Sequence, residues 1–261
     1  MFLKNKTAIV YGATGGIGSS VSRSLAREGA HVILVARGQD KLDKLAAELR
    51  NNGGSVETKS MDALDETAMI QFANEVAGKA GRIDIAINVI SIADVQGALL
   101  REMNYADFVQ PIEKAMHAQF ITAKAVSPHM VKQRSGVILM VTATPARMAF
   151  ERTGGFGPAC AAMEGMSRIL AAELGTHGVR VNVIRSSGSP DSEEAATAGR
   201  NIAEGAGMTE EEITNHFLDF SLLKRNPMLK EIGDIVAFAA SDYASIMTGT
   251  VFNATGGSIV D

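Results

Sequence analysis

The sequence predicts an α/β fold: one domain in which a doubly wound parallel sheet carries helices on both faces. Short apolar segments alternate regularly with amphipathic segments along the 261 residues. Most of the apolar segments are apolar at successive positions, which is typical of strands that are covered on both sides. No linker rich in Pro, Gly and Ser divides the chain, and its length suits a single hydrophobic core.

The first half of the chain contains four predicted strands separated by three predicted helices. The strands are "TAIVYG", "HVILVAR", "SVETKSMD" and "IDIAINVI", and the helices are "GSSVSRSLAREG", "DKLDKLAAELRNNGG" and a third that starts from about Asp65. In the second helix, Leu42, Leu45 and Leu49 share one face, as expected of a helix that packs on a sheet. Asp40 can cap its start, and Gly53 can end it in the left-handed conformation.

The second half continues the same alternation. A long helical region ends near Gln133, and the strands "GVILMVT", "VRVNVI" and "TVFNA" are separated by a helix over Gly154 to Gly175, with a glycine-rich entry, and by a helix around Asp234. Residues 186–223 interrupt the alternation, are rich in Ser, Gly, Ala and Glu, and contain no clear strand. We interpret this segment as a lid over a substrate pocket within the single domain 1–261.

Composition excludes several classes of protein. The chain has 25 Lys and Arg against 29 Asp and Glu, for a net charge of -4, so it lacks the basic surplus that binding to nucleic acid requires. It has no long uncharged apolar run and no signal-peptide pattern, so we expect a cytoplasmic protein without a membrane partner. One Cys and five His show no metal-ligand spacing, so no metal site is expected.

The segment "YGATGGIG" joins the first predicted strand to the first predicted helix, with the pattern Gly12-x3-Gly16-x-Gly18. Glycines at such a junction allow a tight turn and let a pyrophosphate approach the backbone at the N-terminus of a helix. A glycine cluster on its own is often only a turn, but its place at the first strand–helix junction favours dinucleotide binding. The residues expected at the phosphates are Gly12, Thr14, Gly15, Gly16, Ile17 and Gly18.

The end of the second strand, "LVARGQD", bears on the choice of cofactor. A carboxylate at this place would bind the ribose 2′-hydroxyl of NAD, whereas an Arg accommodates the 2′-phosphate of NADP. The sequence has Ala36 and Arg37 here, which favours NADP over NAD. The alternative is a solvated Arg that simply begins a loop.

Taken together, these segments resemble the short-chain dehydrogenase/reductase (SDR) family over nearly the whole chain. The glycine loop is similar to that of the family, "SMDALDE" matches its Asp motif, and "IDIAINVIS" resembles its Asn-containing strand end. "MEGMSRILAAELGTHGVRVNVI" and the C-terminal "IVAFAASDYASIMTGTVFNATGG" are also similar. The resemblance implies a Rossmann-type fold and an oxidoreductase that acts on a small molecule, with Asp62, Ala63 and Asn88 among its cofactor contacts.

The catalytic positions of the family pattern are altered. Where the resemblance places an Asn, a Ser, a Tyr and a Lys, this sequence has Ala115, Ala143, Phe156 and Cys160. Phe156 has no exchangeable proton, and a neutral thiol at Cys160 cannot replace an ammonium. The chain is therefore identified as an atypical member of the family.

Other residues could supply the missing chemistry. Thr142 and Thr144 flank Ala143 and could hold a substrate carbonyl, Tyr105 could reach the pocket from the start of the long helix, and the Arg147 to Arg152 loop carries charged side chains. The alternative for Tyr105 is an aromatic that packs at a helix start. Cys160 is interpreted as a small buried side chain rather than a nucleophile, and His117 as a packing or interface residue.

Two functions therefore remain open. The first is an atypical NADP(H)-linked oxidoreductase for an unknown carbonyl, alcohol or enoyl substrate, and the second is a redox-inactive dinucleotide-binding protein that acts as a sensor or a silent subunit. In either case the Ala-rich helix Ala159 to Leu174 and the long helix before Gln133 resemble the pair that joins subunits in the family. We expect a homodimer or homotetramer.

Overall fold

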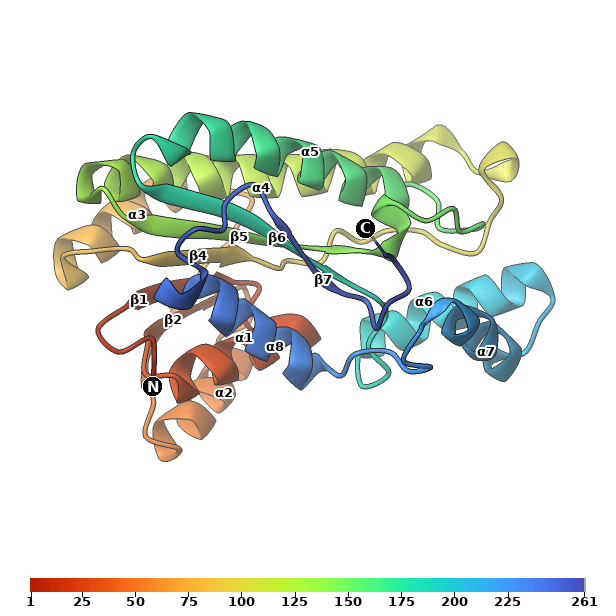
Figure 1. Cartoon of the computed structure of the whole chain (residues 1–261), viewed down its shortest axis with the longest axis horizontal. Coiled ribbons are helices and arrows are strands. Elements are labelled where there is room, and N and C mark those ends of the chain that lie inside the picture. The colour runs from red at the N-terminus through yellow and green to blue at the C-terminus, as the bar shows by residue number, and fades with distance from the viewer. Residues whose placement is uncertain (261) are drawn as a thin grey trace.

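A seven-stranded, wholly parallel sheet forms the centre of the molecule (Figure 1). The computed structural model describes residues 1–260, and its strands lie in the order β3-β2-β1-β4-β5-β6-β7. Their bounds are β1 Thr7–Tyr11, β2 His31–Ala36, β3 Ser55–Ser60, β4 Ile85–Asn88, β5 Gly136–Ala143, β6 Val179–Ser186 and β7 Val251–Ala254. The strand order reverses between β1 and β4, which makes the sheet doubly wound.

Three helices cover each face of the sheet, and each layer closes its own apolar core (Figure 1). One face carries α1 (Gly16–Arg27), α2 (Gln39–Asn51) and α8 (Leu229–Ala240). The other carries α3 (Glu66–Ala80), α4 (Tyr105–Gln133) and α5 (Phe156–Gly175). Because both faces are covered, the strand side chains are buried in succession; β1 and β4 are buried at every position.

The segment predicted as a lid folds into two helices beyond the carboxyl ends of the strands. These are α6 (Glu193–Ala206) and α7 (Glu210–Phe220), which lie together at the right of Figure 1. Ser192 caps α6 by accepting a hydrogen bond from the Ala195 N–H at 3.3 Å, and Thr209 and Glu212 form a capping box on α7. As expected from sequence, no strand lies between residues 187 and 223.

The predicted strands and the α/β architecture are confirmed, and so is the left-handed Gly53 after α2, with φ of +82°. The prediction that Asp40 caps α2 is wrong. The helix starts two residues earlier than a cap at Asp40 implies, at Gln39, with Gly38 at the N-cap and no side-chain cap. Asp40 instead lies in the first turn, where its charge still complements the helix dipole.

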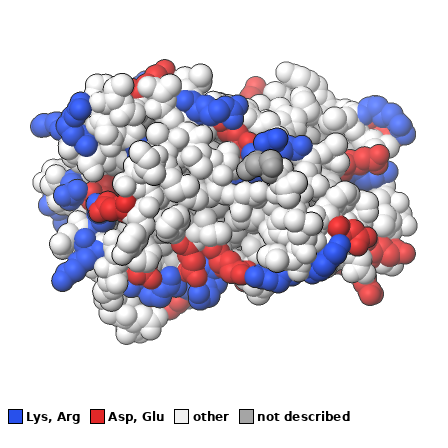
Figure 2. Space-filling model, viewed as in Figure 1, with Lys and Arg blue, Asp and Glu red and all other residues white. Residues whose placement is uncertain are grey.

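The mixed charges of the surface and the limited hydropathy of the helices match the composition of the sequence. On the face shown in Figure 2, Lys and Arg side chains are interspersed with Asp and Glu. Within residues 1–260, no helix combines the length and the apolar character needed to cross a bilayer. Three short 3-10 helices complete the described chain: η1 (Leu100–Glu102), η2 (Thr144–Ala146) and η3 (Asp242–Ala244).

The close contact between α1 and α8 provides a test of the packing. A Cβ atom on Gly233 of α8 would lie 2.7 Å from the carbonyl oxygen of Ser20 and 2.8 Å from the Oγ of Ser24. We expect Gly233→Ala to lower the free energy of unfolding by about 1–3 kcal/mol, because backbone and hydroxyl groups would have to shift. Urea denaturation measures this change.

Gly78 in α3 is the matched control, since a Cβ there meets nothing within 4 Å. Gly78→Ala should leave stability equal or raise it by up to about 1 kcal/mol, through helix propensity alone. Equal unfolding midpoints for wild type and Gly233→Ala would contradict the tight α1–α8 contact.

Candidate functional site

One large cavity, of about 980 Å³, opens at the carboxyl ends of the central strands beneath α6 and α7. Ligands of open α/β sheets bind at this edge, where the strand order reverses. Its lining includes the turn after β1, the ends of β2, β4, β5 and β6, the start of α5, and residues of both lid helices. The cavity is therefore the place where predicted cofactor and catalytic residues can meet.

The glycine loop forms one wall of the cavity and has little room for side chains. Gly12 has φ of +81°, and a Cβ there would lie 2.8 Å from the backbone of Val89. A Cβ on Gly18 would collide with the carbonyl oxygen of Gly12, so this glycine allows the turn and is not itself part of the lining. Gly12, Thr14, Gly15, Gly16 and Ile17 line the cavity, and the first-turn amides of α1 have no partner within their helix.

A pair of cations lies at the end of β2. Arg37 lines the cavity as predicted, and Lys41, one helical turn further on, lines it as well. Both residues are exposed, and within residues 1–260 neither side chain has a hydrogen-bond or ion-pair partner. Such unpaired cations favour the binding of an anionic group such as a phosphate.

Asp62, Ala63 and Asn88 also line the cavity. The Asp62 Oδ1 accepts a hydrogen bond from the Leu64 N–H at 3.0 Å, which orders the turn after β3. The amide of Asn88 is fully buried; it donates to Thr122 Oγ1 at 2.8 Å and accepts from the Ile90 N–H at 3.1 Å. Asn88 therefore fastens the end of β4 to α4 and shapes the floor of the cavity.

Three of the four positions that the family resemblance assigns to catalysis border the cavity. Ala143, Phe156 and Cys160 line the cavity, whereas Ala115 is fully buried and lies outside the lining. Burial raises the pKa of the Cys160 thiol to about 12, the backbone of Ala143 opposes this shift only in part, and the nearby carboxylates of Glu164 and Asp94 raise the pKa further. The thiol is therefore neutral at physiological pH and poorly suited to act as a nucleophile.

The two threonines beside Ala143 differ in their environment. Thr142 donates a hydrogen bond from Oγ1 to Glu164 Oε1 at 3.0 Å. The hydroxyl of Thr144 lines the cavity and has no partner within residues 1–260. Thr144 is consequently the hydroxyl that a substrate oxygen can reach without disrupting an existing hydrogen bond.

A buried ion pair lies beside Thr142. The guanidinium of Arg185, on β6, donates to both carboxylate oxygens of Glu164, on α5, at 2.8 and 2.6 Å. Their side chains are 3% and 6% exposed, so this bidentate pair is enclosed in protein. The pair links α5 to β6, and the hydrogen bond from Thr142 links both to β5. These bonds lie next to Ala143, which follows Thr142 in sequence.

None of the three tyrosines lines the cavity. Tyr105 is 75% exposed at the start of α4, Tyr243 is 77% exposed, and Tyr11 is fully buried in the core, where desolvation raises the pKa of its phenol. The structure thus does not bring the candidate Tyr105 to the other site residues. The reason is its position in the first turn of α4, where its side chain is directed to solvent rather than toward the sheet.

The loop between β5 and α5 contributes apolar rather than charged groups. Phe150 lines the cavity, packed edge-on against Phe217 of α7 with a centroid separation of 5.2 Å. Arg147, Glu151 and Arg152 are outside the lining, and Arg152 donates to the carbonyl oxygen of Gly97 at 2.9 Å. The charged groups of this loop therefore do not face the cavity.

Six charged residues of the lining were missed by reasoning from sequence: Lys41, Asp94, Lys114, Glu194, Arg200 and Glu210. Asp94 accepts a hydrogen bond from Gln96, and half-buried Lys114 has no partner within residues 1–260. Lys41 had a signal, since it lies four residues after Arg37, in the first turn of the helix that follows the second strand. Lys114 and Glu194 had none, because the approach of α4 and α6 to the cavity depends on tertiary structure.

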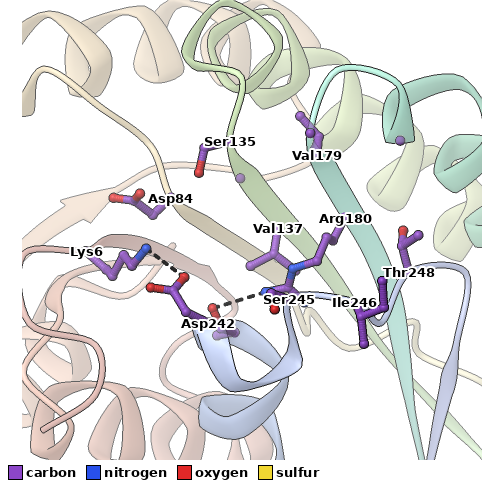
Figure 3. A pocket seen from close by; sticks show the side chains of 14 residues that line it. Lys6, Asp84, Ser135, Val137, Val179, Arg180, Asp242, Ser245, Ile246 and Thr248 are labelled. Carbon is purple, nitrogen blue, oxygen red and sulfur yellow. Dashed lines mark hydrogen bonds and ion pairs between the residues drawn. The ribbon is translucent and has the colours of Figure 1, made fainter.

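A second, smaller cavity, of about 310 Å³, lies at the opposite edge of the sheet (Figure 3). Its charged groups already have partners: Lys6 binds Asp242 at 3.0 Å, and Arg180 donates to the carbonyl oxygen of Ala239 at 2.8 Å and to that of Ser241 at 3.1 Å. Arg180 thereby caps the carboxyl end of α8. Within residues 1–260, no group of three or more His, Cys, Asp or Glu side chains is arranged to hold a metal ion.

Comparison with known proteins finds reductases and other oxidoreductases over nearly the whole chain. A family model described as Enoyl-(Acyl carrier protein) reductase matches residues 12–258. The chain is 29% identical over 259 residues to the uncharacterized oxidoreductase YxbG of Bacillus subtilis, covering 98% of this chain and 91% of the relative. It is 28% identical over 262 residues to 3-oxoacyl-[acyl-carrier-protein] reductase FabG of Thermotoga maritima, covering the whole of both chains.

Among solved structures, a NAD+-bound xylitol dehydrogenase superposes with a TM-score of 0.91 at 23% identity, covering 98% of this chain and all of the other. At this identity the superposition shows the fold alone. The match to the family model extends from the glycine loop almost to the C-terminus, and it shows the family. This chain belongs to the short-chain dehydrogenase/reductase family of oxidoreductases.

Proposed function

We propose that this protein binds NADP(H) and is an atypical oxidoreductase for a small carbonyl, alcohol or enoyl substrate. The observation that supports this function is the continuity of the cavity, which extends from Arg37 past the glycine loop to Thr144 and Phe156. The relative named for 3-oxoacyl reduction makes a carbonyl the first substrate class to test. When bound, the dinucleotide supplies or accepts the hydride.

The cofactor end of the cavity fits a phosphorylated dinucleotide. The glycine loop offers bare backbone at the N-terminus of α1, where a pyrophosphate would bind. Arg37 and Lys41 would hold the 2′-phosphate, and Asp62, Ala63 and Asn88 would border the rest of the cofactor. The two cations are what favours NADP over NAD.

The substrate end differs from the family pattern. Apolar side chains border it, among them Phe150, Phe156, Met163 and Phe217, so a substrate with an apolar body would fit. Thr144 would hold the substrate oxygen. Lys114 also lines the cavity, and its ammonium has no hydrogen-bond or ion-pair partner within residues 1–260. An ammonium can stabilise a developing alkoxide and give it a proton.

A second function is favoured by a specific observation. Phe156 and the buried, neutral Cys160 provide neither the acid nor the ribose-binding cation of the family pattern. A dinucleotide-binding protein without redox activity, a sensor or a silent subunit, would keep the glycine loop and lose these groups. Cofactor binding and turnover therefore have to be measured separately.

The first prediction concerns cofactor choice. The wild type should bind NADPH more tightly than NADH, and Arg37→Ala and Lys41→Ala should each reduce this preference about tenfold, since each removes a charge-assisted contact to the 2′-phosphate. Calorimetric titration with both dinucleotides measures it.

Lys44→Ala is the control, because Lys44 is an exposed cation of α2 outside the cavity lining. Equal affinities of the wild type for NADPH and NADH would refute the assignment of Arg37 and Lys41. Absence of binding to either dinucleotide would refute the oxidoreductase function as well.

The second prediction concerns turnover. Reduction of a simple ketone with NADPH should be slow or undetectable, because a missing acid or base typically lowers a rate by about 10² to 10⁴. Phe156→Tyr combined with Cys160→Lys should restore activity only in part, since Ala115 and Ala143 still lack the Asn and Ser and such groups act as a unit.

Wild-type turnover at about 1 to 10³ per second, the usual range for enzymes, would be inconsistent with loss of the catalytic groups. In that event Lys114→Met and Thr144→Val should abolish it, and Tyr105→Phe should not. NADPH binding by the same variants verifies that they are folded.

The third prediction concerns assembly: we propose a homodimer or homotetramer joined through α4 and α5. Phe120 on α4 and Ile169 on α5 are 53% and 62% exposed, although both are large apolar side chains. Light scattering should therefore give a mass of two or four chains. Phe120→Glu with Ile169→Glu should reduce it to one chain, Leu222→Glu should leave it unchanged, and a monomeric wild type at micromolar concentration would refute the proposal.

A further inference from the structure

The lid places a carboxylate against the glycine loop. A Cβ atom on Gly16 would lie 3.3 Å from Glu194 Oε2, and one on Gly15 would lie 3.8 Å from Glu194 Oε1. The same carboxylate accepts a hydrogen bond from the Ser192 hydroxyl at 3.0 Å, which fixes its direction. Glu194 of α6 thus faces the N-terminus of α1, although more than 170 residues separate them in sequence.

The helix α1 supplies no anion at its own N-terminus. Its N-cap is Gly15, which makes no side-chain cap, and its first turn contains no acidic residue. Free amides and the helix dipole favour a negative group at this end. Glu194 supplies one from another element, in the position that a cofactor pyrophosphate would need.

The charge of Glu194 is not neutralised by a cation. Within residues 1–260 it has no ion pair, whereas its neighbour Glu193 binds Arg200 at 3.0 Å. Arg37 and Lys41 line the cavity just after the end of β2, where the 2′-phosphate is expected. A pyrophosphate at Gly15 and Gly16 would meet a carboxylate of like sign within a few ångströms.

We propose that Glu194 is an internal anion that occupies the phosphate position of the cofactor site and sets the affinity of that site for dinucleotides. Binding of the pyrophosphate displaces the carboxylate, which obliges the start of α6 to move or the Glu194 side chain to turn away. Because α6 and α7 also cover the substrate end, this displacement couples cofactor entry to the position of the lid. The inference rests on the proposed binding of NADP(H).

Glu194→Gln removes the charge and keeps the shape, and Glu204→Gln is the control on the same helix, because Glu204 is exposed and lies outside the cavity lining. We expect Glu194→Gln to bind NADPH about tenfold more tightly than the wild type, since one like-charge repulsion near the surface is lost. Glu204→Gln should bind as the wild type does. Calorimetry at fixed ionic strength measures all three proteins.

A fragment separates repulsion at the phosphate position from a general change. Adenosine 2′-monophosphate has the 2′-phosphate but no pyrophosphate, so its affinity should be equal in wild type and Glu194→Gln. ADP-ribose, which has the pyrophosphate, should gain affinity in the variant as NADPH does. Glu194→Ala, which also removes the hydrogen bond with Ser192, should show the same pattern.

The outcomes distinguish the two proposals. Tight NADPH binding by the wild type with no gain in Glu194→Gln, or weaker binding in the variant, would overturn the role of Glu194 and leave the proposed function intact. Failure of both the wild type and Glu194→Gln to bind any dinucleotide would overturn both proposals. An equal gain with adenosine 2′-monophosphate would also overturn the inference, because the effect would not depend on the pyrophosphate.

Discussion

The site depends on the reversal of strand order between β1 and β4. Both strands are buried at every position, and they pair directly. Because the strand order reverses between them, the segments that leave them run to opposite faces of the sheet. The glycine loop turns to α1 on one face, and the segment after Asn88 leads toward α4 on the other. Contact between these segments is close: Gly12 leaves no space for a Cβ beside Val89 and Ile90. The large cavity opens where they separate.

Much of this arrangement could be predicted because it is encoded locally. Successive apolar positions gave the strands, and the Gly12, Gly16 and Gly18 spacing marked the first strand–helix junction. Arg37 could be placed because the end of the second strand is a fixed point of this fold. Even the error at Asp40 was local, a shift of two residues in where α2 begins.

The remaining site residues could not be predicted, since tertiary packing places them. Tyr105 was a candidate from its residue type, but its position in the first turn of α4 exposes it to solvent. Lys114 and Glu194 belong to elements whose approach to the cavity depends on how α4 and α6 pack. The ion pair between Glu164 and Arg185 joins residues on different elements, and neither position alone indicates a partner.

The ion pair between Glu164 and Arg185 also explains why the fold does not depend on charged groups at Phe156 and Cys160. A buried carboxylate without a cation is strongly destabilising, and Cys160, one turn before Glu164 on α5, supplies no charge. Arg185 neutralises Glu164 from the adjacent strand β6 with two hydrogen bonds, and Thr142 donates a third. The polar groups behind the catalytic positions therefore satisfy one another. On the proposed function, Thr144 and Lys114 would supply the chemistry of the site, and Glu194 would compete with the cofactor for the phosphate position.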